Sequence, residues 1–170
     1  MADAATPFLS VVLVPGHGKK NTAEFLRRAA AYFDLKKWSW EILPPEKIAS
    51  ARGKYVLRAD AGLRVPIKEA DLLIAAIDSG CDVAAGSRRM SDPRCDVQRS
   101  LGGRLAGFFL HFLDRGSVKG MQDARCPFQC FRLEAAQAVF QGSFLSEVQA
   151  LSLAQKKGLR VREIAVMWKD

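Results

Sequence analysis

Apolar and polar positions along the chain form two kinds of pattern, short β-branched runs and longer stretches with helical spacing. Residues 8–14 (FLSVVLV) are a short apolar run that Pro15 ends, which predicts a buried parallel strand. Similar runs predict further strands at residues 38–43, 55–58, 83–85 and 161–167. Apolar residues three or four positions apart predict helices at residues 23–33, 66–79, 101–113, 134–140 and 144–157. This alternation favours a single α/β domain over residues 1–170, with a mainly parallel sheet flanked by helices.

Composition narrows the class of protein. The chain has 170 residues, of which 49% are apolar and 26% charged, so it can bury a core and does not resemble a disordered protein. Its longest apolar runs fall well short of the ~20 residues that span a bilayer. The first residues match neither a signal peptide nor a transit peptide, and the four cysteines are too few and too scattered for a disulfide framework. We expect a soluble, non-secreted protein with reduced cysteines, in a reducing compartment or at a membrane periphery; the compartment itself stays open.

Basic residues outnumber acidic ones, 26 Lys and Arg against 18 Asp and Glu, which leaves a net charge of +8. Such an excess favours an anionic partner: a phosphate ester, an acidic membrane surface or RNA. Lys19 and Lys20 lie between a predicted strand and helix, where they could bind a phosphate or form a solvated turn. A set of arginines could receive a lipid phosphate, contact anionic headgroups or RNA, or form a solvated basic face: Arg88, Arg89, Arg94 and Arg99, with Arg104 and Arg115 nearby.

Several short stretches occur in the order and spacing of a known enzyme family. They are residues 51–57 (ARGKYVL), Asp60 and Ala61 with Pro66 and Ile67, 86–89 (GSRR), 98–100 (QRS), 119–126 (KGMQDARC), Phe128, 131–132 (FR), Phe144, Glu147, and 163–166 (EIAV) with Trp168. Residues 10–15 (SVVLVP) also match the family's first strand. On these stretches the chain resembles a glycosyltransferase of family two with the GT-A fold, in the branch of dolichyl-phosphate glucosyltransferases and polyprenyl-phosphate glycosyltransferases.

The resemblance implies a GT-A-like (Rossmann-like) sheet and transfer of a sugar from a nucleotide sugar to a lipid phosphate. In such enzymes an acidic pair holds a divalent metal on the diphosphate, so Asp60 would be the metal ligand, with Mg²⁺ or Mn²⁺ in an active enzyme. The catalytic candidates are Asp60, Asp123 and Glu147. The candidates for binding phosphate or acceptor are Lys19, Lys20, Arg88, Arg89, Arg99 and Arg125. Of these, Asp123, Arg125 and Glu147 could instead form structural ion pairs.

The chain departs from the family pattern where nucleotide and metal should bind. Gly62 stands where the metal motif requires a second carboxylate, so Asp60 has no acidic partner in the motif. The loop at residues 16–20 is basic where the family has polar and acidic residues, and only residues 43–50 lie where the family has a nucleotide-handling segment. Residues 126–129 (CPFQ) and 145–147 (LSE) also depart from family signatures. We therefore expect a retained fold with a shortened nucleotide-binding half, lost donor and metal binding, and no cofactor.

Loss of the middle segment would expose a new edge of the predicted sheet, and an exposed edge strand needs cover. Trp38 and Trp40 lie on that edge, where aromatic side chains suit a protein partner. Three functions follow. The favoured one is an inactive glycosyltransferase-like protein that acts as a structural or interaction subunit of a larger assembly, because metal and nucleotide features are lost together. The alternatives are a minimal active glycosyltransferase and a basic adaptor for RNA or an anionic membrane surface.

Overall fold

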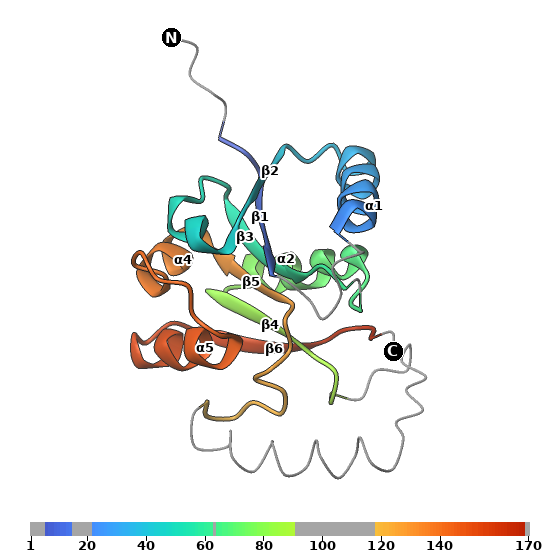
Figure 1. Ribbon diagram of the computed structural model, residues 1–170. Coiled ribbons are helices and arrows are strands. Elements are labelled where there is room, and N and C mark those ends of the chain that lie inside the picture. The colour runs from blue at the N-terminus through green and yellow to red at the C-terminus, as the bar shows by residue number, and fades with distance from the viewer. Residues whose placement is uncertain (1–5, 15–21, 63, 91–117, 169–170) are drawn as a thin grey trace.

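Six strands form one sheet in the computed structural model, which describes residues 6–14, 22–62, 64–90 and 118–168 (Figure 1). Their order across the sheet is β2-β1-β3-β5-β4-β6. β1 pairs in parallel with β2 and β3, and β4 pairs in parallel with β6. The expected α/β fold with a mainly parallel sheet is confirmed. The strands are β1 (Leu9–Val14), β2 (Trp40–Leu43), β3 (Tyr55–Asp60), β4 (Val83–Ser87), β5 (Gln129–Arg132) and β6 (Val161–Ala165).

β5 is a strand that the hydrophobic pattern did not predict. It has only four residues, and both of its ends are polar, so Cys130 and Phe131 alone supply an apolar signal. β5 runs antiparallel to both of its neighbours, β3 and β4. It therefore joins the two parallel parts of the sheet, which do not pair with each other directly.

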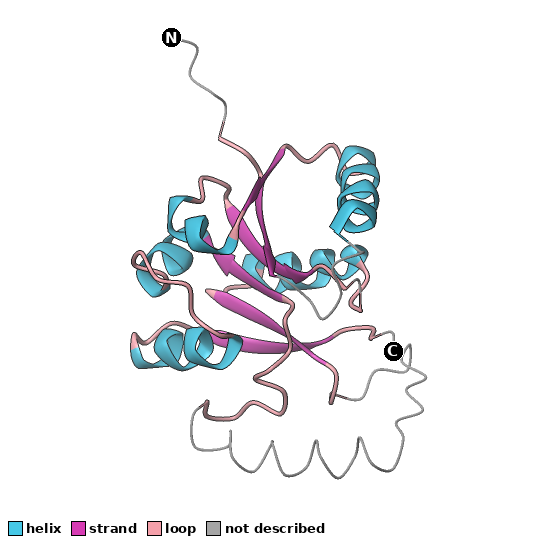
Figure 2. Ribbon diagram, in the orientation of Figure 1, coloured by secondary structure: helices cyan, strands magenta, loops and turns pink. Residues whose placement is uncertain are grey.

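Helices cover both faces of the sheet (Figure 2). A short turn of 3₁₀-helix, η2 (Ile67–Glu69), leads into the second long helix of the first face. The first face carries α1 (Thr22–Leu35) and α2 (Ala70–Asp78), and the second carries η1 (Pro45–Ser50), α4 (Leu133–Val139) and α5 (Glu147–Lys156).

β1 shows how the sequence pattern produces these layers. Side chains alternate between the two faces of a strand, so Leu9 and Val11 join the core under α1 and α2, while Val12 joins the core under α4 and α5. All three are fully buried. A strand buried on both faces needs a continuous apolar run, which is what residues 8–14 supply.

The ends of two elements differ from the prediction for local reasons. α5 begins at Glu147 rather than at residue 144, because Ser146 and Gln149 form a reciprocal capping box. β4 continues through Gly86 and Ser87, past the predicted end at residue 85, and the Gly86 N–H donates to the Phe128 carbonyl at 2.8 Å.

Three other expectations concern the cysteines, one predicted helix and membrane-spanning segments. Cys81, Cys126 and Cys130 are buried free thiols, while Cys95 lies outside the described residues. The helix expected at residues 101–113 also lies outside them. Among the helices that the structure does describe, none is long and apolar enough to cross a membrane.

Candidate functional site

The strands β1, β2, β3, β4 and β6 all end at one side of the sheet, here called the carboxyl edge. Open α/β sheets bind their ligands outside the carboxyl ends of parallel strands. Asp60 ends β3 at this edge, where it is paired in register with Val14 of β1. Arg88 follows β4 at the same edge. The fold therefore brings the Asp60 and Arg88 candidates to the side of the sheet where a substrate would bind.

Asp60 begins a tight turn that leaves it without a second carboxylate. Its Oδ1 accepts the N–H of Gly62 at 2.9 Å, and the N–H of Ala61 donates to the Val14 carbonyl at 3.2 Å. A Cβ added at Gly62 would lie 2.8 Å from Oδ2 of Asp60, so a side chain there would displace this carboxylate. Ala61 is buried and contributes no ligand atom.

The described donors at Asp60 do not form a complete protein site for the divalent metal that the family resemblance implies. Mg²⁺ is usually held by one or two carboxylates together with waters and substrate phosphates, and it prefers near-octahedral oxygen coordination. Within the described ranges, no group of three or more His, Cys, Asp or Glu residues could hold a metal ion. Asp60 is thus a single carboxylate, and we derive no chemical step through a metal.

An apolar hollow of about 360 Å³ lies beside Asp60, between the carboxyl ends of β1 and β2. Its lining includes Leu13, Leu43, Pro44 and Ala61, and the described residues that line it carry no charge. In the family pattern, acidic residues at the ends of the first two strands would grip the base and ribose. The described residues that line the hollow offer a base and ribose no charged partner.

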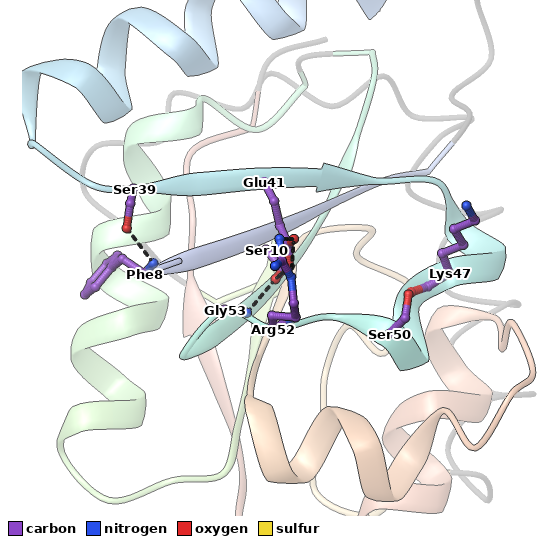
Figure 3. A network of polar contacts seen from close by, with 8 residues as sticks. All are labelled: Phe8, Ser10, Ser39, Glu41, Lys47, Ser50, Arg52 and Gly53. Atoms are coloured by element: carbon purple, nitrogen blue, oxygen red, sulfur yellow. Dashed lines mark hydrogen bonds and ion pairs between the residues drawn. The ribbon is translucent and has the colours of Figure 1, made fainter. Parts of the chain in front are cut away.

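The link after β2 is short, and polar contacts fasten it to the sheet (Figure 3). η1 follows β2 after Pro44, and the chain returns to β3 through Arg52 and Gly53. Glu41 of β2 accepts hydrogen bonds from the Ser10 hydroxyl at 2.7 Å and from the Arg52 guanidinium at 2.8 Å. The Gly53 N–H donates to the same hydroxyl at 2.8 Å. We call Ser10, Glu41, Arg52 and Gly53 the β1–β2 clip.

The charge of Glu41 is stabilised by the β1–β2 clip. Partial burial opposes ionisation, but hydrogen bonds from Ser10 and Arg52 outweigh it, so the pKa of Glu41 lies below its ordinary value. The Glu41 side chain is only 15% exposed, whereas that of Arg52 is 59% exposed. The clip therefore closes the short link at the place where the family has its nucleotide-handling segment.

β2 is the edge strand that the sequence predicted, but its tryptophans face inward. The Trp38 ring lies 4.8 Å from the Phe8 ring and 5.9 Å from the Phe33 ring, between centroids. The Trp40 ring lies 5.4 Å from that of Phe33. Packing against α1 thus accounts for both indoles, and Ile42, which is 42% exposed, is the large apolar side chain that β2 presents outward.

Arg88 and Asp123 form a tight ion pair at the carboxyl edge. Nε and Nη2 of Arg88 each donate to an Asp123 carboxylate oxygen at 2.6 Å, and the Arg88 backbone N–H adds a third bond at 3.0 Å. Asp123 is 4% exposed, and the Arg88 guanidinium lies 4.8 Å from the centroid of the Trp168 ring. Burial alone would raise the pKa of Asp123, but the bonds from Arg88 outweigh it and the pKa is lowered.

Glu163 of β6 holds the loop that carries Asp123 through two hydrogen bonds. Its carboxylate accepts the backbone N–H of Asp123 at 2.7 Å and that of Gln122 at 2.8 Å. Arg88, Asp123 and Glu163 are therefore one connected set, which we call the edge ion-pair set. It connects the residue after β4 with the middle of β6. Of its two carboxylates, Asp123 is buried and Glu163 is partly buried and bound to backbone N–H groups.

Arg58 is a buried cation in the middle of β3, with a side chain that is only 1% exposed. Its Nη1 donates to the Gln129 side chain at 3.1 Å and its Nη2 to the Leu145 carbonyl at 3.0 Å. The Glu147 carboxylate lies 3.5 Å from Nη2, while Nε is buried without a hydrogen-bond partner among the described residues. Burial lowers the pKa of Arg58, and the charge of Glu147 opposes this shift.

The other candidates divide between described and undescribed parts of the chain. The backbone N–H of Arg89 donates to the Ser87 hydroxyl at 3.3 Å, and Arg125 is exposed. Lys19, Lys20 and Arg99 lie outside the described residues. Asp123 and Glu147 both occupy ion pairs, the alternative to a catalytic role that the sequence left open. Their catalytic role, and phosphate binding by the basic residues, stay predictions.

Sequence reasoning missed the importance of Arg58 and of Glu163. A signal for Arg58 was present, because a charged residue inside the apolar run YVLRA is unusual for a buried strand and implies a specific partner. Glu163 stood in a stretch that matched the family, but nothing in its spacing indicated that it would bind two backbone N–H groups forty residues earlier.

The fold is that of GT-A glycosyltransferases. The chain is similar to glucosyl-3-phosphoglycerate synthase from Mycobacterium tuberculosis in complex with Mg²⁺ and uridine diphosphate. The match covers 98% of this chain and 72% of the synthase chain, with a TM-score of 0.62 and 11% sequence identity. The same enzyme with uridine diphosphate gives a TM-score of 0.58 at 13% identity. At such identities the likeness concerns the fold alone, which confirms the predicted GT-A-like architecture.

In sequence, the chain is similar to a dolichyl-phosphate beta-glucosyltransferase of Dictyostelium discoideum. The two are 29% identical over 133 residues, which cover 72% of this chain and 41% of that protein. The chain thus spans about two fifths of the length of this curated relative. No family model matches the chain. The similarity confirms the resemblance to glycosyltransferases that the short stretches indicated.

Proposed function

We propose that this chain is a glycosyltransferase-like protein that has lost nucleotide-sugar and metal binding and acts as a structural or interaction subunit of a larger assembly. The observation that carries the proposal is the turn at Asp60, which offers one carboxylate, because Gly62 carries no side chain and its N–H donates to that carboxylate. A GT-A donor site needs a metal to bridge the diphosphate, and one carboxylate supplies that metal with few protein ligands.

The shape of the first strands supports the same proposal. β2 is the edge of the sheet, and η1 with the β1–β2 clip occupies the link where a nucleotide-handling segment would leave and return. The hollow beside Asp60 is apolar. A diphosphate in that place would lose its hydration without gaining charged partners from the described lining, which disfavours binding.

The test is a calorimetric titration with uridine diphosphate-glucose and guanosine diphosphate-mannose, each with and without Mn²⁺. We expect no saturable binding up to about 1 mM, which corresponds to less than about 4 kcal/mol of binding free energy. In parallel, sugar transfer to a polyprenyl phosphate should be absent. Metal-dependent binding together with transfer would overturn the proposal.

A minimal active glycosyltransferase is the second candidate, and the position of Asp60 favours it. This carboxylate ends β3 at the carboxyl edge and is partly exposed, so it could contact a substrate-borne metal. The matched variant is Asp60→Ala, with Asp34→Ala, an exposed acid on α1, as its control. If the protein transfers sugar, Asp60→Ala should abolish the transfer and Asp34→Ala should not; unchanged turnover in both would remove Asp60 from the mechanism.

A basic adaptor for RNA or an anionic membrane is the third candidate, and the net charge of +8 is its motivation. Binding through phosphate contacts weakens steeply as salt rises, because bound counterions are released. Filter binding to RNA and sedimentation with phosphatidylserine vesicles should therefore be compared at low and high salt. Salt-independent binding would contradict this candidate.

A protein contact at the β2 edge belongs to the favoured proposal. Since Trp38 and Trp40 pack against α1, the contact would use the unpaired backbone groups of β2 and the exposed Ile42 side chain. Ile42→Lys places a charge on the edge without touching the core. We expect it to weaken any assembly formed through this strand, as measured by analytical ultracentrifugation of the complex.

A further inference from the structure

α1 carries two apolar stripes, and the sheet accounts for one of them. Phe25, Ala29 and Phe33 are buried and form the stripe that packs on the core. The second stripe is Ala31, Tyr32 and Leu35, at helical spacing of three, four and seven from Arg28. Leu35 is 77% exposed, more than any other large apolar side chain of the described residues. A helix that is apolar on a second side usually buries that side against something else.

The second stripe forms one wall of a groove of about 460 Å³. The opposite wall comes from the segment around η2 and from the end of the chain after β6: Pro66, Ile67, Lys68 and Met167. This volume lies in the range of ~300–1,000 Å³ that is typical of ligand sites. The groove shares no lining residue with the apolar hollow beside Asp60.

The walls of the groove are apolar with basic side chains on both sides. Arg28 lines it from α1, where its Nε bridges the Glu24 carboxylate at 2.6 Å, and Lys68 lines it from the opposite wall. Lys68 is exposed and forms no ion pair with the described residues. At the end of α1, the Lys36 ammonium bridges Asp71 at 2.6 Å and lies 5.8 Å from the centroid of the Tyr32 ring. An apolar floor with cations beside it suits an apolar surface that is flanked by carboxylates.

We infer that this groove docks an amphipathic helix of an acidic partner protein. The stripe on α1 presents apolar positions at i+3, i+4 and i+7, the spacing at which one helix packs along another. Lys68 would pair with Glu or Asp on the partner helix, while Arg28 would keep Glu24 as its partner on α1. A flat bilayer surface would leave the hollow between the two walls unfilled, so the concave shape favours a helix. The inference rests on the proposed interaction role and names the chemistry of the partner.

The test uses the full chain and a defined probe. The probe is a synthetic fluorescent 14-residue peptide with Leu at positions i, i+3, i+4 and i+7 and mainly Glu elsewhere; the control peptide has Lys in place of Glu. We expect saturable binding of the Glu peptide, with a Kd of about 10–100 μM, and much weaker binding of the Lys peptide. Amide shifts of the ¹⁵N-labelled protein should map to residues 28–35 and 66–68.

Two variants and a matched control locate the site. Leu35→Asp and Lys68→Glu change exposed side chains, so the fold should persist, and each should weaken the Glu peptide about tenfold. Ile42→Asp makes the same type of change at an exposed apolar residue of β2 and should leave binding unchanged. No saturable binding, equal binding of both peptides, or equal weakening by Ile42→Asp would overturn the inference.

The peptide-binding test of the groove and the sugar-transfer test of the proposed function can fail independently of each other. If the peptide does not bind and the chain also fails to transfer sugar, the docking groove is wrong and the proposed loss of activity stands. If sugar is transferred and the peptide binds, the groove stands and the loss of activity is wrong. Sedimentation with phosphatidylserine vesicles that depends on Leu35, with no peptide binding, would replace the helix by a lipid surface and overturn the inference.

Discussion

The two halves of the sheet place their polar contacts differently. In the first half, formed by β2, β1 and β3, charged groups gather in the β1–β2 clip, and the described lining of the hollow at the carboxyl edge beside Asp60 carries no charge. In the second half, formed by β5, β4 and β6, the edge ion-pair set lies at the carboxyl edge itself. Among the described residues, the charged side chains at the carboxyl edge of the second half thus bind one another, whereas those of the clip lie away from the hollow beside Asp60.

This contrast separates two ways in which a site can be absent. In the first half, the described lining of the hollow beside Asp60 offers a diphosphate no charged side chain. The second half has a strong cation, Arg88, but its guanidinium donates two hydrogen bonds to Asp123, and its backbone N–H donates a third. A phosphate at this arginine would have to compete with a carboxylate that is 4% exposed.

The largest effect is expected from breaking the edge ion-pair set. Asp123→Ala removes the carboxylate that neutralises Arg88 and should lower the free energy of unfolding by about 3 kcal/mol, because a partly buried cation loses its partner. Urea unfolding followed by circular dichroism measures the loss. The double variant Arg88→Ala/Asp123→Ala should lose less than the sum of the single variants. A loss below about 1 kcal/mol for Asp123→Ala would mean that the pair is not structural.

The next largest effect is expected from a side chain added at Gly53, which lies close to Ser10 in the β1–β2 clip. A Cβ at Gly53 would lie 2.8 Å from the Ser10 hydroxyl oxygen and would overlap the Ser10 backbone nitrogen. Gly53→Ala should therefore cost about 2 kcal/mol of unfolding free energy through overpacking. Lys54→Ala, at the neighbouring exposed position, is the control and should change stability little. Equal stability of the two variants would show that the link after β2 is free to move.

A smaller effect should appear as a pH dependence of the clip. The folded-state pKa of Glu41 is below its ordinary value of 4.5, so its ionised form stabilises the fold above that pH. This stabilisation is lost as the pH falls through the lowered pKa. Glu41→Gln should thus cost about 1 kcal/mol at neutral pH and less near pH 3. A difference from the wild type that is constant over this range would contradict the role of the charge.

The smallest effect is expected at Arg58, although it is the most deeply buried charge described. Nε has no hydrogen-bond partner, and the Glu147 counter-ion is 24% exposed and can be hydrated. Arg58→Met keeps much of the apolar packing between Phe140 and Phe144, so it should change the free energy of unfolding by less than about 1 kcal/mol. A loss of unfolding free energy as large as that of Asp123→Ala would contradict this prediction. It would mean that buried charges stabilise both halves of the sheet to a similar extent.

Most of the fold could be predicted because its central strands and helices have strong periodic patterns. The run at residues 8–14 becomes β1, and the spacing over residues 23–33 becomes α1. β5 could not be predicted, because its four residues have polar ends and its place between β3 and β4 depends on pairing with segments far away in the sequence. The start of α5 at Glu147 depends on the capping box of Ser146 and Gln149, which hydrophobic periodicity does not show.

The candidate site was predicted in part. The motif at Asp60 showed the missing carboxylate, since a metal motif is local in sequence. The partners of Asp123 and Glu147 were left open, because ion pairs between residues 35 and 89 positions apart depend on the topology. The tryptophans of β2 were assigned to a partner on their residue type alone. Their contact with Phe33 is tertiary, and no sequence spacing indicated it.

The position of β5 has a consequence for how the chain folds. β2, β1 and β3 can pair as soon as the first sixty residues are available, whereas the β3 and β4 edges meet only through a strand that begins at Gln129. A chain emerging from the ribosome therefore carries the unpaired outer side of β3 through the synthesis of almost seventy further residues. Such non-local closure slows folding and exposes strand edges to other chains. Residues 129–132 complete the sheet, and until they are synthesised the facing edges of β3 and β4 stay open to pairing with other chains.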